Sequence, residues 1–368
     1  MALRVVHCGS GSSGKRALAG ILDHPDLELV GQYVWSKDKA GVDSGVLAGR
    51  APCGVKATND WQALVDLKAD CLSYFGRAMP GATSNVDEML PFLATGTNVV
   101  NFSAFEFAHP PSAPAEPKRR IEEACKAGRS TMFFTGIDPG WATTDLAIAA
   151  LAAADRVDCV RVLELGWFGS YPSQSLREVF GFGLRPGELP GMMRDGKLEG
   201  LWKPTLLHIA DILGVEIDDW ERSFEIATLD HDIEAGIGKV EAGTAVVIHF
   251  ELRAMSGGAP IVVVEHVDSI ARGAAKHWKA PHAPVDLVHR VEIEGNPNFS
   301  LEVAYAPDGS AGGCTVMPVV NAIPAVCAAR PGILGPLDVP RYWGRNVRAS
   351  ARRAPGPPPK TYNLLPEG

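Results

Sequence analysis

The sequence contains no long hydrophobic run. No uninterrupted apolar segment reaches the roughly 20 residues that a membrane-spanning helix requires. The chain also passes from Met1 directly into a short apolar segment, without the basic region and longer apolar stretch of a secretory signal. We therefore expect a cytoplasmic protein with no membrane association.

Paired cysteines are also missing. The seven cysteines are an odd number, they are scattered along 368 residues, and no two of them form a C-x-x-C pair. This spacing argues against a disulfide framework and against a zinc site, and it fits a reducing compartment. The sequence therefore predicts no structural disulfide and no bound metal.

Long runs of like charge are absent as well. The net charge is −8, and no basic segment is long enough to follow a phosphate backbone, so nucleic acid is not an expected partner. Hydrophobic residues make up 46% of the chain, and we find no internal repeat. At this length, that content is enough for two hydrophobic cores, so we expect two domains.

What the sequence does contain is a glycine-rich turn near its start. An apolar run over residues 3–8 leads into Gly9, Gly11 and Gly14, which match the G-x-G-x-x-G pattern of dinucleotide-binding folds. The first glycine allows a tight turn, the second lets backbone approach a pyrophosphate, and the third lets helix and strand pack closely. A helix over residues 13–22 would point its N-terminus at the phosphates. The predicted cofactor-binding residues here are Gly9, Gly11, Ser12, Ser13 and Gly14.

Two other interpretations of this turn remain open. Glycine-rich turns also serve plain chain reversal. In addition, Gly9, Gly14 and Lys15 almost complete a phosphate-binding loop, but Arg16 stands where that loop needs a serine or threonine for Mg²⁺. The missing hydroxyl argues against a nucleoside triphosphatase.

A second strand over residues 27–35 completes the βαβ unit. The residues at the tip of this strand determine whether NAD(H) or NADP(H) is bound. An acidic residue there would hold a ribose hydroxyl, whereas small polar and basic residues accommodate a 2′-phosphate. The tip presents Ser36 and Lys37 before the first carboxylate, Asp38. This order favours NADP(H), with NAD(H) possible, although the three residues also fit an ordinary solvated turn.

Further strands are expected over residues 69–75, 98–105 and 130–137, followed by an alanine-rich helix from about Thr143. In open parallel sheets, ligands bind beyond the carboxyl ends of the strands. Glu106 and Ser103 lie at this edge by position. The further cofactor-binding candidates at the edge are Phe75, Gly76 and Asn101.

From about Val160 the pattern changes to long strands with few helices. These strands look antiparallel and are linked by turn signals. A helix over residues 203–213, or a partner chain, would cover the open sheet, so we expect a homodimer. The predicted strands are residues 160–168, 244–255, 261–270, 287–294 and 299–305.

The predicted fold class is therefore α/β, a Rossmann-type doubly wound parallel sheet followed by a second α+β domain on an open, largely antiparallel sheet. A helix over residues 316–327 is expected to return to the first domain. We expect a dinucleotide-binding domain at 1–142, a substrate-binding and oligomerisation domain at 143–315, the returning segment at 316–353, and a proline-rich tail at 354–368.

Three stretches together resemble the dihydrodipicolinate reductase superfamily: residues 9–14, residues 41–49 and the Gly-Ile-Asp-Pro-Gly of residues 136–140. Within it, the length and the segment Asn-Ala-Ile-Pro-Ala-Val at 321–326 are most similar to the 2,4-diaminopentanoate dehydrogenase and native amine dehydrogenase branch. The resemblance adds Asn321 to the cofactor-binding candidates. The paired histidines and the Pro-Ser-Gly-Thr loop of the reductases proper are absent, which argues against a dicarboxylate substrate.

The amine dehydrogenase branch implies a single catalytic glutamate just past the fifth strand, and the matching residue is Glu106. Its neighbours Phe105 and Phe107 are apolar, and a carboxylate in such company suggests a tuned pKa. The alternative is a surface carboxylate with two aromatics turned inward. The resemblance implies NAD(P)H-dependent interconversion of a carbonyl compound plus ammonia with a primary amine.

An apolar wall is expected around the substrate, which would select a small neutral carbonyl compound. Taken singly, each residue of this wall fits plain core better, and Arg177 and Arg185 are close enough in sequence to recognise an acid group instead. Another imine or carbonyl reductase, or a non-catalytic nucleotide sensor, therefore remains an alternative. The proposed wall is Trp141, Phe168, Tyr171, Phe180, Thr315 and Met317.

Overall fold

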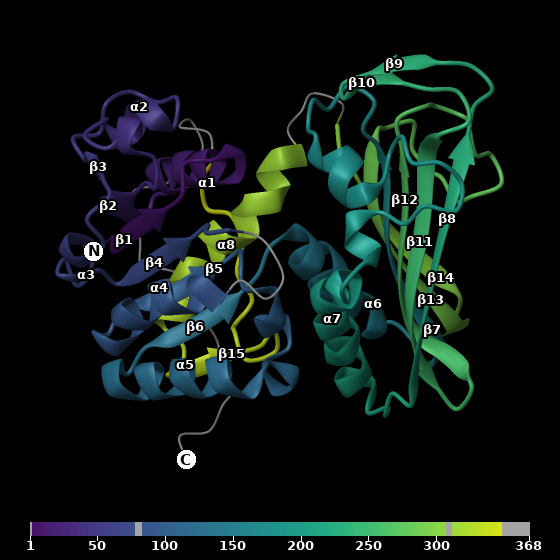
Figure 1. Cartoon of the computed structure of the whole chain (residues 1–368). Helices are drawn as coiled ribbons and strands as arrows, with labels where there is room; N and C mark the ends of the chain where they lie inside the picture. The colour runs from purple at the N-terminus through teal and green to yellow at the C-terminus, as the bar shows by residue number, and fades with distance from the viewer. Residues whose placement is uncertain (1, 78–82, 307–310, 348–368) are drawn as a thin grey trace.

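The structure is a computed structural model that describes residues 2–77, 83–306 and 311–347. The chain forms two large β-sheets with their own helices, lying side by side, and a separate two-stranded sheet (Figure 1). The predicted tail at 354–368 lies outside the described residues, and the domain boundaries at 142, 315 and 353 stay predictions. Within the described residues, no helix is long and apolar enough to cross a membrane.

The first sheet has seven strands, all paired in parallel, in the order β15-β6-β5-β4-β1-β2-β3. The crossovers place helices on both faces, which is the doubly wound arrangement. The strands in chain order are β1 (Leu3–Cys8), β2 (Leu27–Tyr33), β3 (Ala57–Thr58), β4 (Cys71–Tyr74), β5 (Asn98–Asn101), β6 (Thr131–Phe134) and β15 (Gly332–Leu334).

Both faces of this sheet are buried, which explains why its strands appear as continuous apolar runs. In β1, Val6 packs under α4 (Thr83–Ala94) and α5 (Ala115–Gly128), whereas Val5 packs under α1 (Ser12–Asp23) and α8 (Ala311–Cys327). Helix α8 thus returns to the half of the molecule that is built on this first sheet. The short helices α2 (Ser44–Leu47) and α3 (Trp61–Val65) complete this half.

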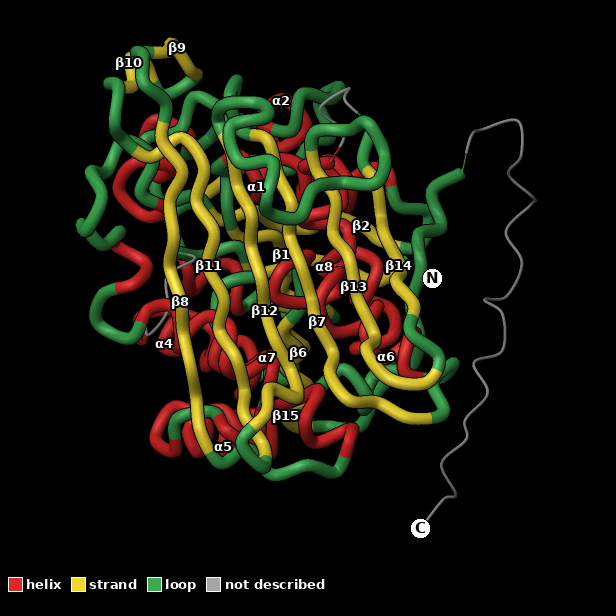
Figure 2. Tube along the Cα trace, turned by 90° about the vertical axis from the view of Figure 1, so that its right-hand side faces the viewer, coloured by secondary structure: helices red, strands yellow, loops and turns green. Residues whose placement is uncertain are grey.

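The second sheet has six strands in the order β14-β13-β7-β12-β11-β8 (Figure 2). Strands β7 and β12 pair in parallel, and all the other neighbours are antiparallel. The strands are β7 (Arg156–Trp167), β8 (Asp219–Thr228), β11 (Ala245–Ser256), β12 (Ala259–Ser269), β13 (Leu287–Asn296) and β14 (Phe299–Ala304), with a small hairpin of β9 (Ile233–Ala235) and β10 (Gly238–Val240). The predicted fold class is confirmed.

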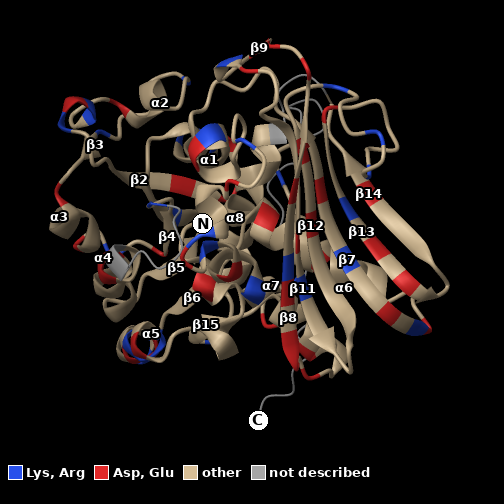
Figure 3. Cartoon of the chain, turned by 45° about the vertical axis from the view of Figure 1, so that its right-hand side comes forward, with Lys and Arg blue, Asp and Glu red and all other residues tan. Residues whose placement is uncertain are grey.

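The two faces of the second sheet differ in character. One face packs against α7 (Lys197–Leu213) and α6 (Leu146–Leu151), burying Trp202 and its neighbours. Acidic and basic residues recur along the strands of this sheet (Figure 3), and some of them lie on the opposite face beside buried apolar side chains such as Leu163. There Arg161 forms ion pairs with Glu251 at 3.1 Å and Glu265 at 3.4 Å.

Several element boundaries differ from the predictions. The strand expected over residues 98–105 ends at Asn101, because the Asn101 Oδ1 accepts the backbone N–H groups of Ser103 and Ala104 and turns the chain out of the sheet. Helix α7 begins at Lys197, before the start expected at residue 203, and contains Pro204 in its interior. Strands β3, β8, β9, β10 and β15 were not predicted.

Candidate active site

The glycine turn has the geometry that each glycine was expected to provide. Gly9 has φ +127°, in the region that favours glycine. A Cβ on Gly14 would lie 2.7 Å from the carbonyl carbon of Gly9, so the helix and the strand pack closely here. A Cβ on Gly11 would meet nothing within 4 Å, so the space beside it is open. No side chain caps the start of α1, which leaves its first N–H groups available to an anion.

Three polar residues, Ser36, Lys37 and Asp38, follow the tip of β2. The Ser36 hydroxyl donates to the Asp38 carboxylate, and Lys37 is exposed. Sequence reasoning missed Lys39, whose Nζ donates to the Ser10 carbonyl at 3.3 Å and lies 3.2 Å from the Ser10 Oγ. The ammonium group of Lys39 is therefore held against the glycine turn. Lys39 lies two positions beyond Lys37, the residue that was predicted.

The other cofactor candidates occupy different environments. Phe75 is buried, and its Cβ would lie 2.9 Å from a Cβ on Gly9, so the end of β4 borders the turn. Gly76 follows it and packs over the ring of Tyr74. Asn101 is fully buried, and its Nδ2 donates to the Phe133 carbonyl. Together with the contacts of its Oδ1, this bond fixes the backbone that leads to Glu106, the predicted catalytic residue.

Asn321 lies on α8, away from the glycine turn. Helices α1 and α8 run alongside each other, with Gly20 beside Met317. Asn321 is one turn further along, near Gly344. Its Oδ1 is buried and has no hydrogen-bond partner among the described residues.

Glu106 lies in a short 3₁₀-helix, Phe105–Ala108, just beyond β5. Both flanking phenylalanines are turned into the core, which leaves the glutamate side chain partly buried. Burial raises the pKa of the Glu106 carboxyl above its usual 4.5. Within the described part of the chain, no basic side chain forms an ion pair with it. The segment packs against α7 of the second half, so Glu106 is placed where the two halves meet.

The six residues of the predicted apolar wall do not form one surface. Trp141 packs with Tyr305 and Cys314, which precedes Thr315 at the start of α8. Phe168 and Phe180 pack in the core of the second half. Tyr171 is exposed, and Met317 packs against Gly20 in the nucleotide-binding half. Of the six, Trp141 and Thr315 lie nearest to the junction of the two halves.

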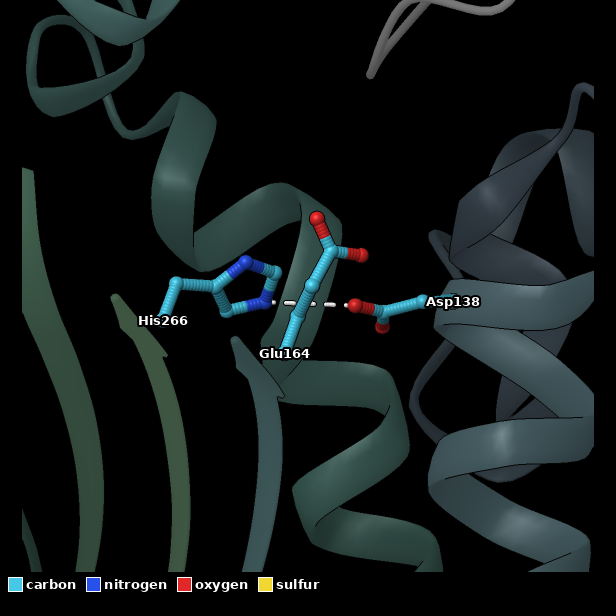
Figure 4. Close-up of side chains that lie close together, drawn as sticks. All are labelled: Asp138, Glu164 and His266. Carbon is cyan, nitrogen blue, oxygen red and sulfur yellow. Dashed lines mark ion pairs between the residues drawn. The ribbon is translucent and has the colours of Figure 1, made fainter. Parts of the chain in front are cut away.

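A group of buried ionisable residues at this junction was not predicted. Asp138 follows β6, whereas Glu164 and His266 are register partners on β7 and β12. The Nε2 of His266 lies 3.2 Å from the Oδ2 of Asp138, and the Glu164 carboxylate lies beside them (Figure 4). The Asp138 Oδ1 accepts a hydrogen bond from the Trp202 Nε1 at 3.1 Å.

Further polar residues surround this group. The His289 Nε2 lies 3.0 Å from the Glu164 Oε2, and its Nδ1 lies 3.0 Å from the Tyr305 hydroxyl. The Asp268 Oδ2 lies 3.8 Å from the Nδ1 of His266. Burial alone would lower the pKa of His266, but the nearby Asp138 and Asp268 carboxylates outweigh it and raise that pKa well above the usual 6.5. Burial raises the pKa of Asp268 to about 6.

The sequence did hold a signal for this group. On β7, Glu164 is in phase with Val160 and Val162, which face the core. On β12, His266 is likewise in phase with Val262 and Val264. Ionisable residues at inward positions of alternating strands indicate a buried polar site.

Comparisons with known proteins agree with this architecture. The family model described as the 2,4-diaminopentanoate dehydrogenase C-terminal domain matches residues 144–352. An amine dehydrogenase of Streptomyces virginiae is 28% identical over 90% of this chain and 94% of its own length. A 2,4-diaminopentanoate dehydrogenase of Acetoanaerobium sticklandii is 25% identical over 66% of each chain.

Solved structures are similar in fold. The structure of an amine dehydrogenase from Mycobacterium smegmatis has a TM-score of 0.72 at 20% identity and covers 94% of this chain and 98% of its own. A dihydrodipicolinate reductase from Paenisporosarcina has a TM-score of 0.50 at 13% identity, over 92% and 99% of the two chains. The resemblance expected from the sequence is confirmed.

Proposed function

Because this chain belongs to the 2,4-diaminopentanoate dehydrogenase C-terminal domain family, we propose that it is an NAD(P)-dependent amine dehydrogenase. It interconverts a carbonyl compound plus ammonia with a primary amine. The similarity to an amine dehydrogenase along nearly the whole chain supports this reaction. The observation that carries the proposal is Glu106, a carboxylate with a raised pKa and no basic partner among the described residues, at the junction of the two halves.

The residues of the glycine turn fit a dinucleotide. The open space beside Gly11 admits a pyrophosphate, and the uncapped start of α1 offers N–H groups to it. When bound, the nicotinamide supplies or accepts the hydride. The preference is for NADP(H), because Ser36 and Lys37 bring one hydroxyl and one ammonium group to the tip of β2 ahead of the first carboxylate, Asp38.

Glu106 performs the proton transfers of the reaction. Its carboxylate takes a proton from ammonium, and the free ammonia attacks the carbonyl carbon. The protonated carboxyl then returns this proton to the hydroxyl of the carbinolamine, which leaves as water. The carboxylate that remains stabilises the iminium cation. A negative charge in a partly buried site stabilises such a cation far more than the same charge in water does.

The substrate is a small, neutral aliphatic carbonyl compound or the matching amine. Trp141 supplies an apolar surface at the junction, with Thr315 close to it along α8. Arg177 does not reach this surface, because its guanidinium donates to the carbonyls of Ile237 and Lys239. Because the Arg177 guanidinium is bound to backbone carbonyls, it is not placed to bind an acid group of the substrate. This supports a substrate that has no acid group.

The active form is a homodimer in the cytoplasm. Helices α6 and α7 cover one face of the second sheet. On the opposite face, the segment 271–285 covers part of the sheet and leaves exposed charges such as Glu294, which a second copy of the chain would cover. Sedimentation analysis tests this assembly. A mass equal to one chain at micromolar concentration would contradict it.

The decisive experiment for the reaction measures NADPH and NADH oxidation with a panel of aldehydes and ketones, with and without ammonium. Turnover that requires ammonium supports the amine dehydrogenase. Turnover without ammonium would identify a carbonyl reductase instead. Glu106→Gln should abolish the ammonium-dependent rate, whereas Glu123→Gln on exposed α5 is the matched control and should leave it unchanged.

A further inference from the structure

The segment 136–145 follows β6 and crosses the junction of the two halves. It carries Asp138, whose carboxylate contacts residues of the second half, and Trp141, which packs with Tyr305. Its backbone turns back on itself, because the Trp141 N–H donates to the Gly136 carbonyl at 2.8 Å. A shift of this segment would therefore move Trp141, the apolar surface at the junction.

Both ends of this segment contact the same side chain, that of Tyr342. Thr135 lies directly before the segment, and its Oγ1 is 3.2 Å from the Tyr342 hydroxyl oxygen. At the other end, the Tyr342 hydroxyl donates to the Asp145 Oδ2 at 3.3 Å. A phenol has a single proton, and Asp145 receives it, so Thr135 is the donor in the first bond. The hydroxyl thus accepts a hydrogen bond at one end and donates one at the other.

Tyr342 comes from a part of the chain that is remote in sequence. It lies 207 positions from Thr135 and 197 positions from Asp145, in the C-terminal segment 335–347 that follows β15. Its ring packs into the core beneath α8 and meets the Phe133 ring edge to face, with the centroids 6.3 Å apart. This packing fixes where the hydroxyl lies.

The bond to Asp145 is sensitive to protonation. Burial raises the pKa of the Asp145 carboxyl to about 6, although the hydrogen bond from Tyr342 and the positive charge of Arg341 oppose this rise. At pH 7 the carboxyl is therefore mainly ionised, and its hydrogen bond from Tyr342 is charge-assisted and stronger than a neutral one. Below pH 6 the carboxyl is protonated, and this additional strength is lost.

We propose that Tyr342 is a positioning residue of the active site, because its hydroxyl bridges Thr135 and Asp145 and so holds Trp141 in place beside the substrate. Tyr342 acts through the segment 136–145 and not on the reacting atoms. Its effect on substrate binding rests on the proposed function, whereas its effect on the position of Trp141 does not. The C-terminal segment thereby contributes to substrate affinity, although it supplies none of the residues predicted for the site.

Tyr342→Phe tests this role, because it removes both hydrogen bonds and keeps the ring. The assay uses the full-length protein, NADPH, saturating ammonium and the aldehyde or ketone that reacts fastest in the panel. KM for this compound should rise about 3- to 10-fold, as expected for a lost hydrogen bond. The kcat should stay within about twofold of the wild type, which is the signature of weakened binding and not of altered chemistry.

Two further variants show whether the bridge itself is responsible. Asp145→Asn keeps an acceptor oxygen for the Tyr342 hydroxyl and should remain close to the wild type in KM. Arg345→Ala is the matched control, because it breaks the ion pair with Asp26 that holds the same C-terminal segment elsewhere. This control should leave KM unchanged.

The pH profile adds a readout that a merely structural tyrosine would not affect. The ratio of the Tyr342→Phe KM to the wild-type KM should be largest above pH 6 and should shrink as pH falls below it, because the wild type then loses the charge-assisted bond. Glu106 titrates in both proteins, so its contribution cancels in the ratio. A ratio that stays constant through pH 6 would contradict the role of Asp145 in the bridge.

Tryptophan fluorescence follows Trp141 without any turnover. The spectrum of each protein minus that of its Trp141→Phe counterpart isolates the Trp141 emission. In Tyr342→Phe this emission should shift to longer wavelength, because the indole becomes more exposed to water. If the wild type shows no ammonium-dependent turnover, the proposed function is refuted, and this spectrum alone decides whether Tyr342 positions Trp141.

The proposal is overturned if folded Tyr342→Phe keeps the wild-type KM, or if its Trp141 emission is unchanged. It is equally overturned if Arg345→Ala raises KM as much as Tyr342→Phe does, because loosening of the whole C-terminal segment would then explain the effect. If Tyr342→Phe does not fold, Thr135→Val removes one of the two bonds at nearly constant shape and should raise KM about threefold. A wild-type KM in that variant would refute the bridge.

Discussion

Gly14 is so close to Gly9 that a Cβ on Gly14 would lie 2.7 Å from the Gly9 carbonyl carbon. A real Cβ cannot approach backbone this closely, so α1 would have to move away from β1. Gly11, between the two, faces open space. The three glycines of one motif therefore differ in what they do: Gly9 and Gly14 maintain the fold, and Gly11 leaves room for a ligand.

Gly11→Val separates these two roles. The variant should remain folded, because its added atoms meet no protein atom near the Cβ, but it should lose cofactor binding because the side chain occupies the place of the pyrophosphate. The measurement is cofactor fluorescence titration together with thermal unfolding. Gly14→Val is the contrasting variant and should lower Tm. Unchanged cofactor affinity in folded Gly11→Val would refute the nucleotide assignment.

Lys37 and Lys39 should have distinguishable effects on cofactor affinity. Lys37 is exposed at the tip of β2, so Lys37→Ala should weaken NADPH binding by about 1.5 kcal/mol, roughly tenfold, and leave NADH unaffected. Lys39→Ala should weaken both cofactors similarly, because its Nζ is bound to Ser10 of the glycine turn. Dissociation constants for both cofactors check this. Equal losses for NADPH and NADH in Lys37→Ala would contradict the preference for NADP(H).

The pH dependence of the rate should report the Glu106 carboxyl. Its deprotonated form accepts the proton from ammonium, so kcat should fall as pH drops through a pKa above the usual 4.5. Glu106→Gln should reduce kcat at least about a hundredfold and abolish this acid limb, while cofactor affinity is retained. A variant with the wild-type pH profile would remove Glu106 from the mechanism.

The same raised pKa predicts an effect on stability. A carboxyl whose pKa is higher in the folded state stabilises the fold below its unfolded pKa, and this contribution is lost as pH rises through the folded pKa. Glu106→Gln cannot ionise, so its Tm should exceed that of the wild type at pH 7 and equal it near pH 4. Thermal unfolding at both values is the check. A lower Tm at pH 7 would show that the charged form has a stabilising partner.

Asn101 should affect the rate indirectly. Its side chain makes three hydrogen bonds to backbone, two of which shape the segment that ends at Glu106. Asn101→Ala should lower the free energy of unfolding by about 1–3 kcal/mol, the range for buried groups left unpaired. Asn101→Asp keeps the two acceptor contacts and should retain more activity than alanine. Identical rates in both variants would argue against this positioning role.

Much of the nucleotide-binding half could be predicted, because its signals are local. The glycine turn needs only Gly9, Gly11 and Gly14 at fixed spacing, and fully buried parallel strands appear as uninterrupted apolar runs. Glu106 was predicted through a family resemblance. It lies past β5 and its pKa is raised, and its catalytic role stays a prediction.

The junction could not be predicted in the same way, because it depends on contacts between distant segments. Asp138 and His266 are 128 positions apart in sequence, and only the packing of β12 against the loop after β6 brings them together. The six residues predicted to form one apolar wall around the substrate do not lie together, for a related reason. Met317 is on a helix that follows the second sheet in sequence but packs against Gly20, within the first half.

The return of the chain to its first sheet has a consequence for biosynthesis. Val316, Val320 and Ile323 of α8 cover the same face of the sheet as α1, and β15 adds the outermost strand beside β6. Both are synthesised after the whole second sheet. The nascent first half therefore exposes apolar surface until α8 and β15 emerge, and a fragment that stops before residue 311 would be prone to aggregate.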